Sequence, residues 1–358
     1  MLVSMTYGVF NGQNMSNSFS EIGSEFWIGE KPETLLTERD GIFVLSGRTA
    51  IDLILQDILK IRPVNSVYMP GWCCESMLAP FVDRGIKAVF YDIRYKDLLK
   101  YELDETVLPD VFYLTNYFGY ANTLPLDLVR HYREKGAIIV YDRTHSFLME
   151  DEAYKALADY SFASIRKWMG VAGGAVVNGL SKSPELKYCS YVEAKEEAMH
   201  DKWRYLNGDT SIAKDDFLNA FASFGHCLSQ DYRNYEMDAL SYSLYKLTDM
   251  DAMKKQRRRN ATYLHTHLSE VRFLDRLAND VFPLFVPVFF ETEEKRNAVR
   301  KRLIDENIYC PIHWPKPKLI PEIFDVNKIY TTELSLICDQ RYGLNEMQRI
   351  VEIIQTEI

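Results

Sequence analysis

The first half of the chain alternates between short apolar runs and segments whose apolar residues recur at helical spacing. Seven runs have the length and composition of β-strands, at residues 42–45, 67–69, 87–91, 111–115, 137–141, 160–163 and 175–177. Helical spacing follows the first run, at Ile51, Ile54, Leu55, Ile58 and Leu59, and returns at residues 77–81 and 126–135. Strands that alternate with helices predict an α/β sheet built through right-handed crossovers.

The second half of the chain has a different pattern. Residues 183–268 are rich in charge and mostly helical in spacing, whereas residues 285–290, 308–311 and 334–337 have the pattern of strands. Residues 293–306 and 345–356 have the spacing of helices. We therefore predict a large domain over residues 1–250 and a small C-terminal α+β domain over residues 251–358.

Composition and charge argue against several classes of function. Apolar residues make up 47% of the chain and the net charge is −9, so a full core is expected and a basic footprint for nucleic acid is not. The arginine triplet at residues 257–259 fits either a solvated helix face or a local basic corner. The six cysteines include no CxxC pair, so neither a metal site nor a disulfide framework is expected. No apolar stretch approaches the ~18 residues of a membrane span, and no signal-peptide pattern opens the chain, so the expected location is the cytoplasm.

The segment Ser46-Gly47-Arg48-Thr49 stands between a predicted strand and a predicted helix. Unpaired amides at a helix N-terminus lie at the positive end of the helix dipole and bind phosphate groups. Glycine at position 47 lets the backbone approach such a group closely. Plain N-capping of the helix by Ser46 explains the same residues, and this segment alone does not decide between the two interpretations.

Asp142 follows directly after the continuous apolar run at residues 137–141, which is typical of a strand buried on both faces of a parallel sheet. Open α/β sheets bind their ligands at the carboxyl ends of such strands. A buried carboxylate needs a positive partner, and a protonated pyridine nitrogen, as in pyridoxal phosphate, is one. The alternative is an aspartate that caps the next turn. His145, three residues on, either contacts the phenolic oxygen of such a cofactor or is a structural histidine.

Lys167 ends the segment Ser164-Ile165-Arg166-Lys167, just before a glycine-rich loop at residues 168–174. A lysine in an apolar turn loses solvation, its pKa falls, and its amine becomes a nucleophile. Ser164, three residues earlier, is placed to hold a phosphate group. An ordinary solvated lysine is the alternative interpretation.

Trp72 follows the predicted strand at residues 67–69 and either stacks on a cofactor ring or packs in the core. The order of a phosphate turn, a strand-end aspartate and a lysine 25 positions later is more specific than any one of its members. Other chemistries find less support, because the chain has no GxSxG, HExxH, Walker A or GxGxxG motif.

With these motifs the chain resembles the DegT/DnrJ/EryC1/StrS aminotransferases, the sugar-aminotransferase branch of the fold-type-I pyridoxal-phosphate enzymes. The resemblance runs from about residue 43 to residue 346 and is carried by residues 43–50, 67–76, 116–119, 141–145, 161–174, 259–264 and 339–342. It implies an α/β, aspartate-aminotransferase-like large domain with a mixed seven-stranded sheet, a small C-terminal α+β domain, and a homodimer.

The resemblance also implies roles for individual residues. Lys167 would hold pyridoxal 5'-phosphate as a Schiff base, Asp142 would face the pyridine nitrogen, and His145 would lie near the phenolic oxygen. The phosphate would be bound by Gly47, Arg48, Thr49 and Ser164. Ser161 is the alternative to Ser164. Cys74 stands where the family usually has an aromatic that stacks on the cofactor ring, and Trp72 is the aromatic nearest to that position.

The activity implied is transamination from a donor such as glutamate to a nucleotide-linked keto sugar, for a polysaccharide or another cell-surface glycan. Neither a nucleic-acid partner nor a membrane partner is expected. Two alternatives remain open at this point: an aminotransferase for a non-sugar ketone, and a cofactor-free descendant that serves as a scaffold.

Overall fold

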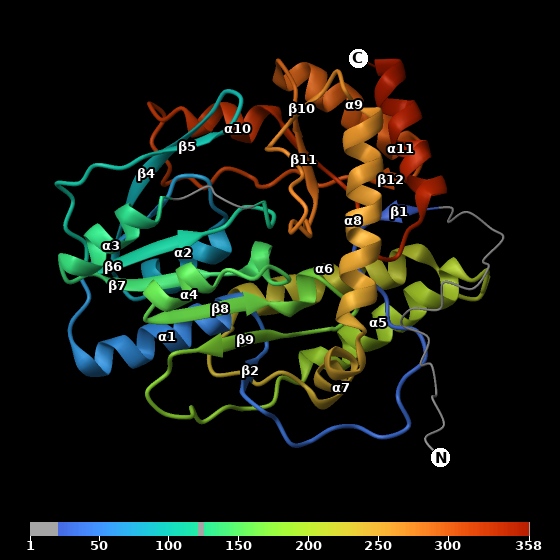
Figure 1. The fold of residues 1–358 in the computed structure, drawn as a ribbon. Coiled ribbons are helices and arrows are strands. Elements are labelled where there is room, and N and C mark those ends of the chain that lie inside the picture. The colour runs from blue at the N-terminus through green and yellow to red at the C-terminus, as the bar shows by residue number, and fades with distance from the viewer. Residues whose placement is uncertain (1–20, 121–124, 358) are drawn as a thin grey trace.

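The computed structural model describes residues 21–120 and 125–357, and its centre is an eight-stranded mixed sheet (Figure 1). In spatial order the strands are β2 (Ile42–Val44), β9 (Ala175–Asn178), β8 (Tyr160–Ser164), β7 (Ile138–Asp142), β6 (Val111–Thr115), β3 (Ser66–Pro70), β4 (Lys87–Tyr95) and β5 (Leu99–Glu102). Strands β8, β7, β6, β3 and β4 are parallel, and antiparallel pairs join β4 to β5, β8 to β9 and β9 to β2. The predicted α/β class with a mixed sheet is therefore confirmed.

The predicted strand number of seven is wrong by one. All seven predicted strands are present, and β5 is added at the edge, antiparallel to β4. Its four residues, LKYE, are half-buried and exposed in alternation, because successive side chains of a strand point to opposite faces of the sheet. Such a short, polar edge strand lacks the continuous apolar run that revealed its neighbours.

Helices follow most of the strands. Those of the first 270 residues are α1 (Gly47–Ile61), α2 (Glu75–Val82), α3 (Leu126–Glu134), α4 (Glu152–Leu157), α5 (Tyr191–Leu206), α6 (Lys214–Gln230), α7 (Ala239–Leu247) and α8 (Met250–His267). Two single 3₁₀ turns, Thr144–Ser146 and Ile165–Lys167, follow β7 and β8 directly. Both turns therefore start at the carboxyl edge of the sheet.

The C-terminal part of the chain forms a separate small sheet with helices. Its strands are β10 (Arg272–Phe273), β11 (Val286–Phe289) and β13 (Glu333–Leu336), and its helices are α9 (Glu293–Asp305), α10 (Val326–Thr332) and α11 (Leu344–Glu357). Strand β1 (Ile22–Gly23) pairs in parallel with β12 (Ile308–Tyr309), so the start of the described chain packs with this part. Helix α8 extends from the level of the large sheet to these elements (Figure 1). The division at residue 250 stays a prediction.

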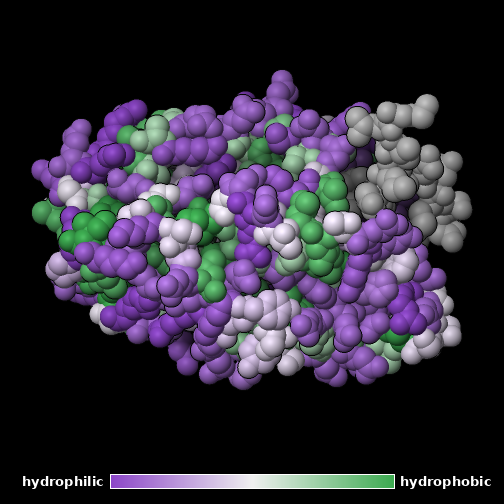
Figure 2. All heavy atoms as spheres, turned by 90° about the horizontal axis from the view of Figure 1, so that it is seen from below, coloured by the Kyte–Doolittle hydropathy of each residue, from purple (hydrophilic) through white to green (hydrophobic). Residues whose placement is uncertain are grey.

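The surface mixes hydrophilic residues with small apolar patches, as the face in Figure 2 shows. Across residues 21–120 and 125–357, no helix has both the length and the apolar character that crossing a membrane requires.

Candidate active site

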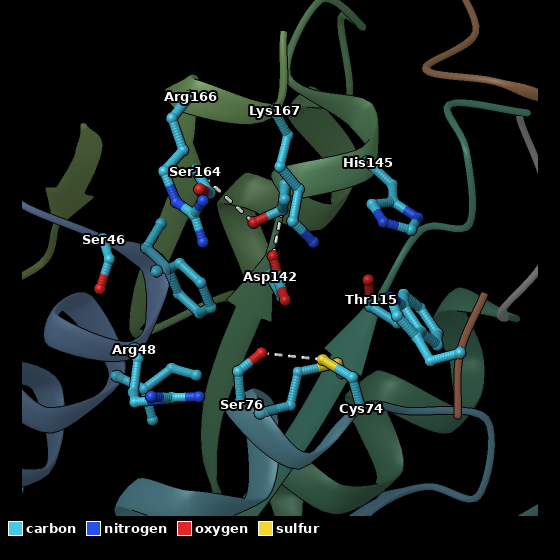
Figure 3. Close-up of a pocket in the computed structure, with 16 residues that line it drawn as sticks. Ser46, Arg48, Cys74, Ser76, Thr115, Asp142, His145, Ser164, Arg166 and Lys167 are labelled. Atoms are coloured by element: carbon cyan, nitrogen blue, oxygen red, sulfur yellow. Dashed lines mark hydrogen bonds between the residues drawn. The ribbon is translucent and has the colours of Figure 1, made fainter. Parts of the chain in front are cut away.

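A cavity lies where β6, β7 and β8 end, beside the N-terminus of α1 (Figure 3). Thr115, Asp142 and Ser164 are the last residues of these three strands, and all three line it. Parallel strands end at the same edge of a sheet, so segments far apart in the sequence meet there. The full lining is Ser46, Gly47, Arg48, Ile51, Cys74, Ser76, Met77, Thr115, Asp142, Thr144, His145, Phe162, Ser164, Arg166, Lys167 and Trp314.

Asp142 is buried on the floor of the cavity, with 5% of its surface exposed. Its Oδ2 accepts a hydrogen bond from the Tyr113 hydroxyl at 2.7 Å, and its Oδ1 accepts one from the backbone N–H of Thr144 at 2.8 Å. Burial raises the pKa of the Asp142 carboxyl, while the Thr144 and Tyr113 donors and the charge of Lys167 oppose that rise. A cationic ring nitrogen at this carboxylate would offset its desolvation.

Thr144 connects the turn after β7 to the turn after β8. Its hydroxyl accepts a hydrogen bond from the backbone N–H of Ser164 at 3.1 Å, and its carbonyl accepts one from the Trp168 indole at 2.6 Å. Through these bonds the segment that carries Asp142 fixes the segment that carries Lys167.

His145 is 3% exposed and closes one side of the cavity. The backbone N–H of Phe118 donates to its Nδ1 at 3.3 Å, which places the proton of the neutral ring on Nε2. Burial lowers the pKa of His145 far below its usual range, and the charges of Lys167 and His313 lower it further. A neutral ring with a free Nε2–H is suited to donate to an anionic oxygen.

Lys167 extends from the turn after β8 into the cavity (Figure 3). Burial lowers the pKa of its amine, Arg166 lowers it further, and Cys74 and Asp142 oppose the shift. A lower pKa increases the fraction of neutral, nucleophilic amine at a given pH. The structure therefore brings the predicted nucleophile and the predicted aspartate into one cavity.

The side of the cavity opposite His145 collects groups suited to an anion (Figure 3). Gly47 opens helix α1, where the first backbone amides have no helical partner. A side-chain carbon added at Gly47 would meet Phe162 and Ser164 at 3.5 Å, so glycine keeps this corner open. Arg48 also lines the corner; one of its guanidinium nitrogens donates to the Leu228 carbonyl at 2.8 Å, and its Nε is buried without a partner.

Arg166 lines the same cavity and was not predicted from the sequence. Its Nε is buried without a partner, and its side chain forms no hydrogen bond or ion pair with residues 21–120 or 125–357. The lining thus holds three cationic side chains, Arg48, Arg166 and Lys167, against one carboxylate, Asp142. An anionic ligand would balance this excess of positive charge. The sequence signal available was the arginine directly before the reactive lysine.

The structure distinguishes between the two serines considered for a phosphate group. Side chains alternate between the two faces of a strand, so Phe162 and Ser164 of β8 share one face and Ser161 lies on the other. Phe162 and Ser164 line the cavity and Ser161 does not. Ser164 is therefore the serine at the cavity, and its contact with a phosphate group stays a prediction.

Two of the expected cofactor contacts lie elsewhere. Thr49 is fully buried, does not line the cavity, and bonds through its hydroxyl and its N–H to the hydroxyl of Ser46. Ser46 is thus the N-cap of α1 as well as a lining residue. Trp72 is also fully buried: it stacks on Tyr117 at 4.5 Å and donates to the His313 carbonyl at 2.5 Å. Core packing, the alternative interpretation, describes Trp72.

Cys74 does line the cavity, with its Sγ 2.9 Å from the Ser76 hydroxyl. The aromatic wall comes instead from Trp314 of the C-terminal part, whose ring lies 5.4 Å from that of His145 and 6.0 Å from the Lys167 amine. No periodicity or motif near residue 314 indicated this contact, because it depends on how the two parts of the chain pack.

A second cavity adjoins the first and shares Arg166, Lys167 and Trp314 with it. Two further arginines line it, but both are bonded to the protein: Arg341 to Asp339 at 2.8 Å and 2.9 Å, and Arg257 to three backbone carbonyls. Arg341 is therefore structural, and Arg166 is the arginine lining this space that has no hydrogen bond or ion pair with the described residues.

The fold and this kind of cavity are those of a pyridoxal-phosphate-dependent transaminase. The model of the DegT/DnrJ/EryC1/StrS aminotransferase family matches residues 30–354, and the chain belongs to that family. A comparison with curated proteins finds no match.

Several solved structures share the fold. One is PseC of Helicobacter pylori, an aminotransferase involved in the biosynthesis of pseudoaminic acid, with a TM-score of 0.65 and 14% identity over 95% of this chain and 99% of that one. Another is the putative sugar aminotransferase Spr1654 of Streptococcus pneumoniae in its PLP form, with a TM-score of 0.62 and 16% identity over 92% of each chain. A third is 3-amino-5-hydroxybenzoic acid synthase, with a TM-score of 0.60 and 18% identity over 88% of this chain and 85% of that one. At these identities the likeness concerns the fold.

Proposed function

We propose that Lys167 holds pyridoxal 5'-phosphate covalently in the first cavity, with Asp142 at the pyridine nitrogen and His145 at the phenolic oxygen. The observation that carries this assignment is the convergence of a lysine of lowered pKa, a buried aspartate and an anion corner on one cavity. The buried Nε atoms of Arg48 and Arg166, which lack partners, fit a phosphate group at that corner.

Three residues of the cavity would each have a separate role in the reaction. The bound cofactor supplies an electron sink for negative charge at the substrate carbon. Asp142 would hold the ring nitrogen in its protonated form, and the Nε2–H of His145 would face the phenolic oxygen. The Lys167 amine would hold the cofactor and would serve as the acid and base that moves a proton at the substrate carbon. The reaction is a ping-pong transamination.

For the substrates, we propose that glutamate is the amino donor and that a nucleotide-linked keto sugar is the acceptor, for a polysaccharide or another cell-surface glycan. Membership of the family supports this choice, as does the adjoining cavity, which reaches Lys167 and has room beside it for a second molecule. PseC, an aminotransferase involved in the biosynthesis of pseudoaminic acid, supports it as well. An aminotransferase for a non-sugar ketone is the second candidate, because an aromatic synthase shares the fold and Cys74 replaces the family's usual aromatic.

We further propose that the enzyme acts as a homodimer in the cytoplasm. Exposed leucines support an interface: Leu35 and Leu36 are more than 40% exposed beside α7, which carries the exposed Leu247, and the N–H of Leu36 donates to Ser243 on that helix. Light scattering from the purified protein should give twice 41.7 kDa. A mass of 41.7 kDa at working concentration would reject the dimer.

The absorption spectrum tests the cofactor assignment directly. Protein mixed with pyridoxal phosphate should show a band near ~420 nm, and Lys167→Ala should lack it. The conservative control is Lys182→Ala, a lysine outside the cavity lining, which should retain the band. A band of equal size in Lys167→Ala would reject Lys167, and no band in any of the three proteins would favour the scaffold alternative. Initial rates with a panel of keto sugars and other ketones then identify the acceptor.

A further inference from the structure

Two buried side chains of β13 and one from the irregular segment between β12 and α10 form a continuous hydrogen-bonded chain that ends at the second cavity. The Glu333 carboxyl is fully buried, and its Oε1 lies 2.5 Å from the Ser335 hydroxyl. That hydroxyl lies 2.8 Å from Nδ1 of His313. The other carboxyl oxygen, Oε2, accepts the backbone N–H of His313 at 2.7 Å, so the carboxyl contacts the same residue twice.

His313 is held at the boundary between this chain and the reactive lysine. Its ring packs against Phe118, Phe285 and the ring of His145, at centroid distances of 5.2 Å, 4.9 Å and 5.8 Å. It lines the second cavity together with Lys167. Nδ1 is committed to Ser335, and Nε2 has no hydrogen bond to residues 21–120 or 125–357. Nε2 is therefore the ring nitrogen left for a ligand.

We propose that Glu333, Ser335 and His313 form a relay that presents the Nε2 proton of His313 to an oxygen atom of the substrate beside Lys167, and that ionisation of Glu333 reverses the relay. As an acid, Glu333 donates its O–H to Ser335, the Ser335 O–H donates to Nδ1, and the ring proton sits on Nε2. When Glu333 gives its proton to solvent, the Ser335 O–H turns to the carboxylate. The ring proton then moves to Nδ1, which donates to Ser335, and Nε2 becomes an acceptor. The ring carries one proton in both states.

The groups around the relay favour the acid form of Glu333 at neutral pH. Burial raises the pKa of Glu333 to about 8, while Ser335, the His313 N–H and the Arg296 charge oppose the rise. Arg296 contacts the backbone carbonyl of Glu333, at 3.0 Å, and the Cys310 thiol, whose pKa burial raises to about 12, also interacts with Glu333.

The ring of His313 stays neutral throughout. Burial lowers its pKa to about 3, and the Lys167 charge adds to that shift. His145, the other titratable group facing the ring, is neutral as well. A donor at this place suits an oxygen atom of a substrate, such as a carboxylate oxygen of glutamate or the carbonyl oxygen of a ketone. Only this last step rests on the proposed function, because it takes the second cavity as the substrate site.

Nitrogen-15 spectra of histidine-labelled protein test the relay without any substrate, since protonated and bare ring nitrogens of a neutral histidine resonate far apart. The His313 signals are identified by their loss in His313→Gln. We expect the proton on Nε2 at about pH 6 and on Nδ1 at about pH 10, with a midpoint near the Glu333 pKa of about 8. In Glu333→Gln the amide oxygen takes over the bond from the His313 N–H, so the NH₂ group faces Ser335 and donates to it, and the proton should stay on Nε2 throughout. Glu322→Gln, an exposed carboxyl of the same part of the chain, should behave as the parent does.

A proton on Nδ1 at about pH 6, or one tautomer across the whole range in the parent, would overturn the relay. If Glu333→Gln does not fold, Ser335→Ala replaces it and should abolish the pH-dependent change of tautomer. The substrate step has its own readout, the rate of the half-reaction with glutamate. That rate should fall above about pH 8 in the parent and stay level in Glu333→Gln. A relay that switches with no effect on the rate would overturn the substrate contact and leave the proposed transaminase function standing.

Discussion

The hydroxyl of Tyr113 on β6 donates to Oδ2 of Asp142 on β7 at 2.7 Å, within two buried, neighbouring strands. This bond holds the carboxylate at the end of its strand and favours its charged form. Without it, the pKa of Asp142 would rise further above its usual range, because burial already raises it. The charge state of Asp142, and with it the proposed role of this carboxylate at a ring nitrogen, thus depends on Tyr113, which does not line the cavity.

Tyr113→Phe should therefore slow the half-reaction with an amino donor while the cofactor still binds. One lost hydrogen bond to a charged group is worth about 1.5–3 kcal/mol, or roughly a tenfold to hundredfold change. Asp142→Asn removes the charge itself and should cost about 10²–10³-fold. Stopped-flow absorbance measures both rates. Equal rates in the parent and in Asp142→Asn would contradict the assignment of Asp142 to the ring nitrogen.

The lowered pKa of Lys167 predicts how binding of the aldehyde depends on pH. A lysine whose pKa is lowered loses its proton at a lower pH than an ordinary lysine, so the rate of covalent binding should reach its plateau at a lower pH. The Asp142 carboxylate raises that pKa, so Asp142→Asn should shift the profile to still lower pH. The rate at which the visible band appears, measured across pH, gives both midpoints. A midpoint at or above that of a free lysine analogue would contradict the desolvated amine.

Arg48→Gln and Arg166→Gln should each weaken binding of pyridoxal phosphate far more than binding of pyridoxal, which lacks the phosphate. The expected loss is about 1.5–3 kcal/mol for each guanidinium that contacts the anion. Arg204→Gln is the matched control, because Arg204 is paired with Asp209 on the surface. Fluorescence titration gives the affinities. If Arg166→Gln weakens both ligands equally, or neither, its guanidinium does not bind the phosphate.

Trp72 and Trp314 should respond to substitution in opposite ways. Trp72→Phe removes a buried hydrogen bond and buried volume, so the free energy of unfolding should fall by about 1–3 kcal/mol with little change in cofactor affinity. Trp314→Phe alters the cavity wall and should change cofactor affinity with little effect on stability. Urea unfolding and cofactor titration separate the two effects. If Trp72→Phe leaves stability unchanged and weakens cofactor affinity, Trp72 contacts the cofactor after all.

Much of the fold was predictable from local patterns alone. The run at residues 137–141 is buried on both faces, so its unbroken apolar sequence predicted a central strand. Asp142 was singled out because it stands at the end of this strand. Residues 99–102 gave no such signal, because an edge strand covered on one side does not need an apolar run. Short pairings such as β1 with β12 depend on partners almost 300 residues away, which no local pattern encodes.

The residues of the candidate site also fall into those that local patterns predict and those that depend on packing. Lys167, Asp142, His145 and Ser164 lie at strand ends, where topology alone brings them together, and all four line the cavity. Thr49 was expected there as part of the phosphate turn, and Trp72 as the aromatic nearest to the position where the family has a stacking residue. Thr49 is bonded back to Ser46, and the indole of Trp72 is turned into the core by its bond to His313. Side-chain direction in a loop or a first helical turn follows from packing that the sequence does not show.

The structure shows why residue 173, in the glycine-rich loop, is a glycine. A side-chain carbon there would lie 2.5 Å from Leu45 Cδ1, so the loop after Lys167 crosses the strand that leads into α1 with no room for a side chain. The glycine-rich loop was expected to create an apolar setting for the lysine. It also fixes how closely the lysine segment approaches the anion corner.

Arg257 of α8 and Gln340 both donate to the carbonyl of Trp168, the residue directly after Lys167. The backbone next to Lys167 is thus held by two residues that follow residue 250 in the chain. An enzyme that combines the large sheet of one relative with the C-terminal part of another would lose these two hydrogen bonds unless both donors were present at the same places. The parts of the chain before and after residue 250 therefore have to match each other at this contact. Chimeras of two relatives joined at residue 250 should fold but have low activity.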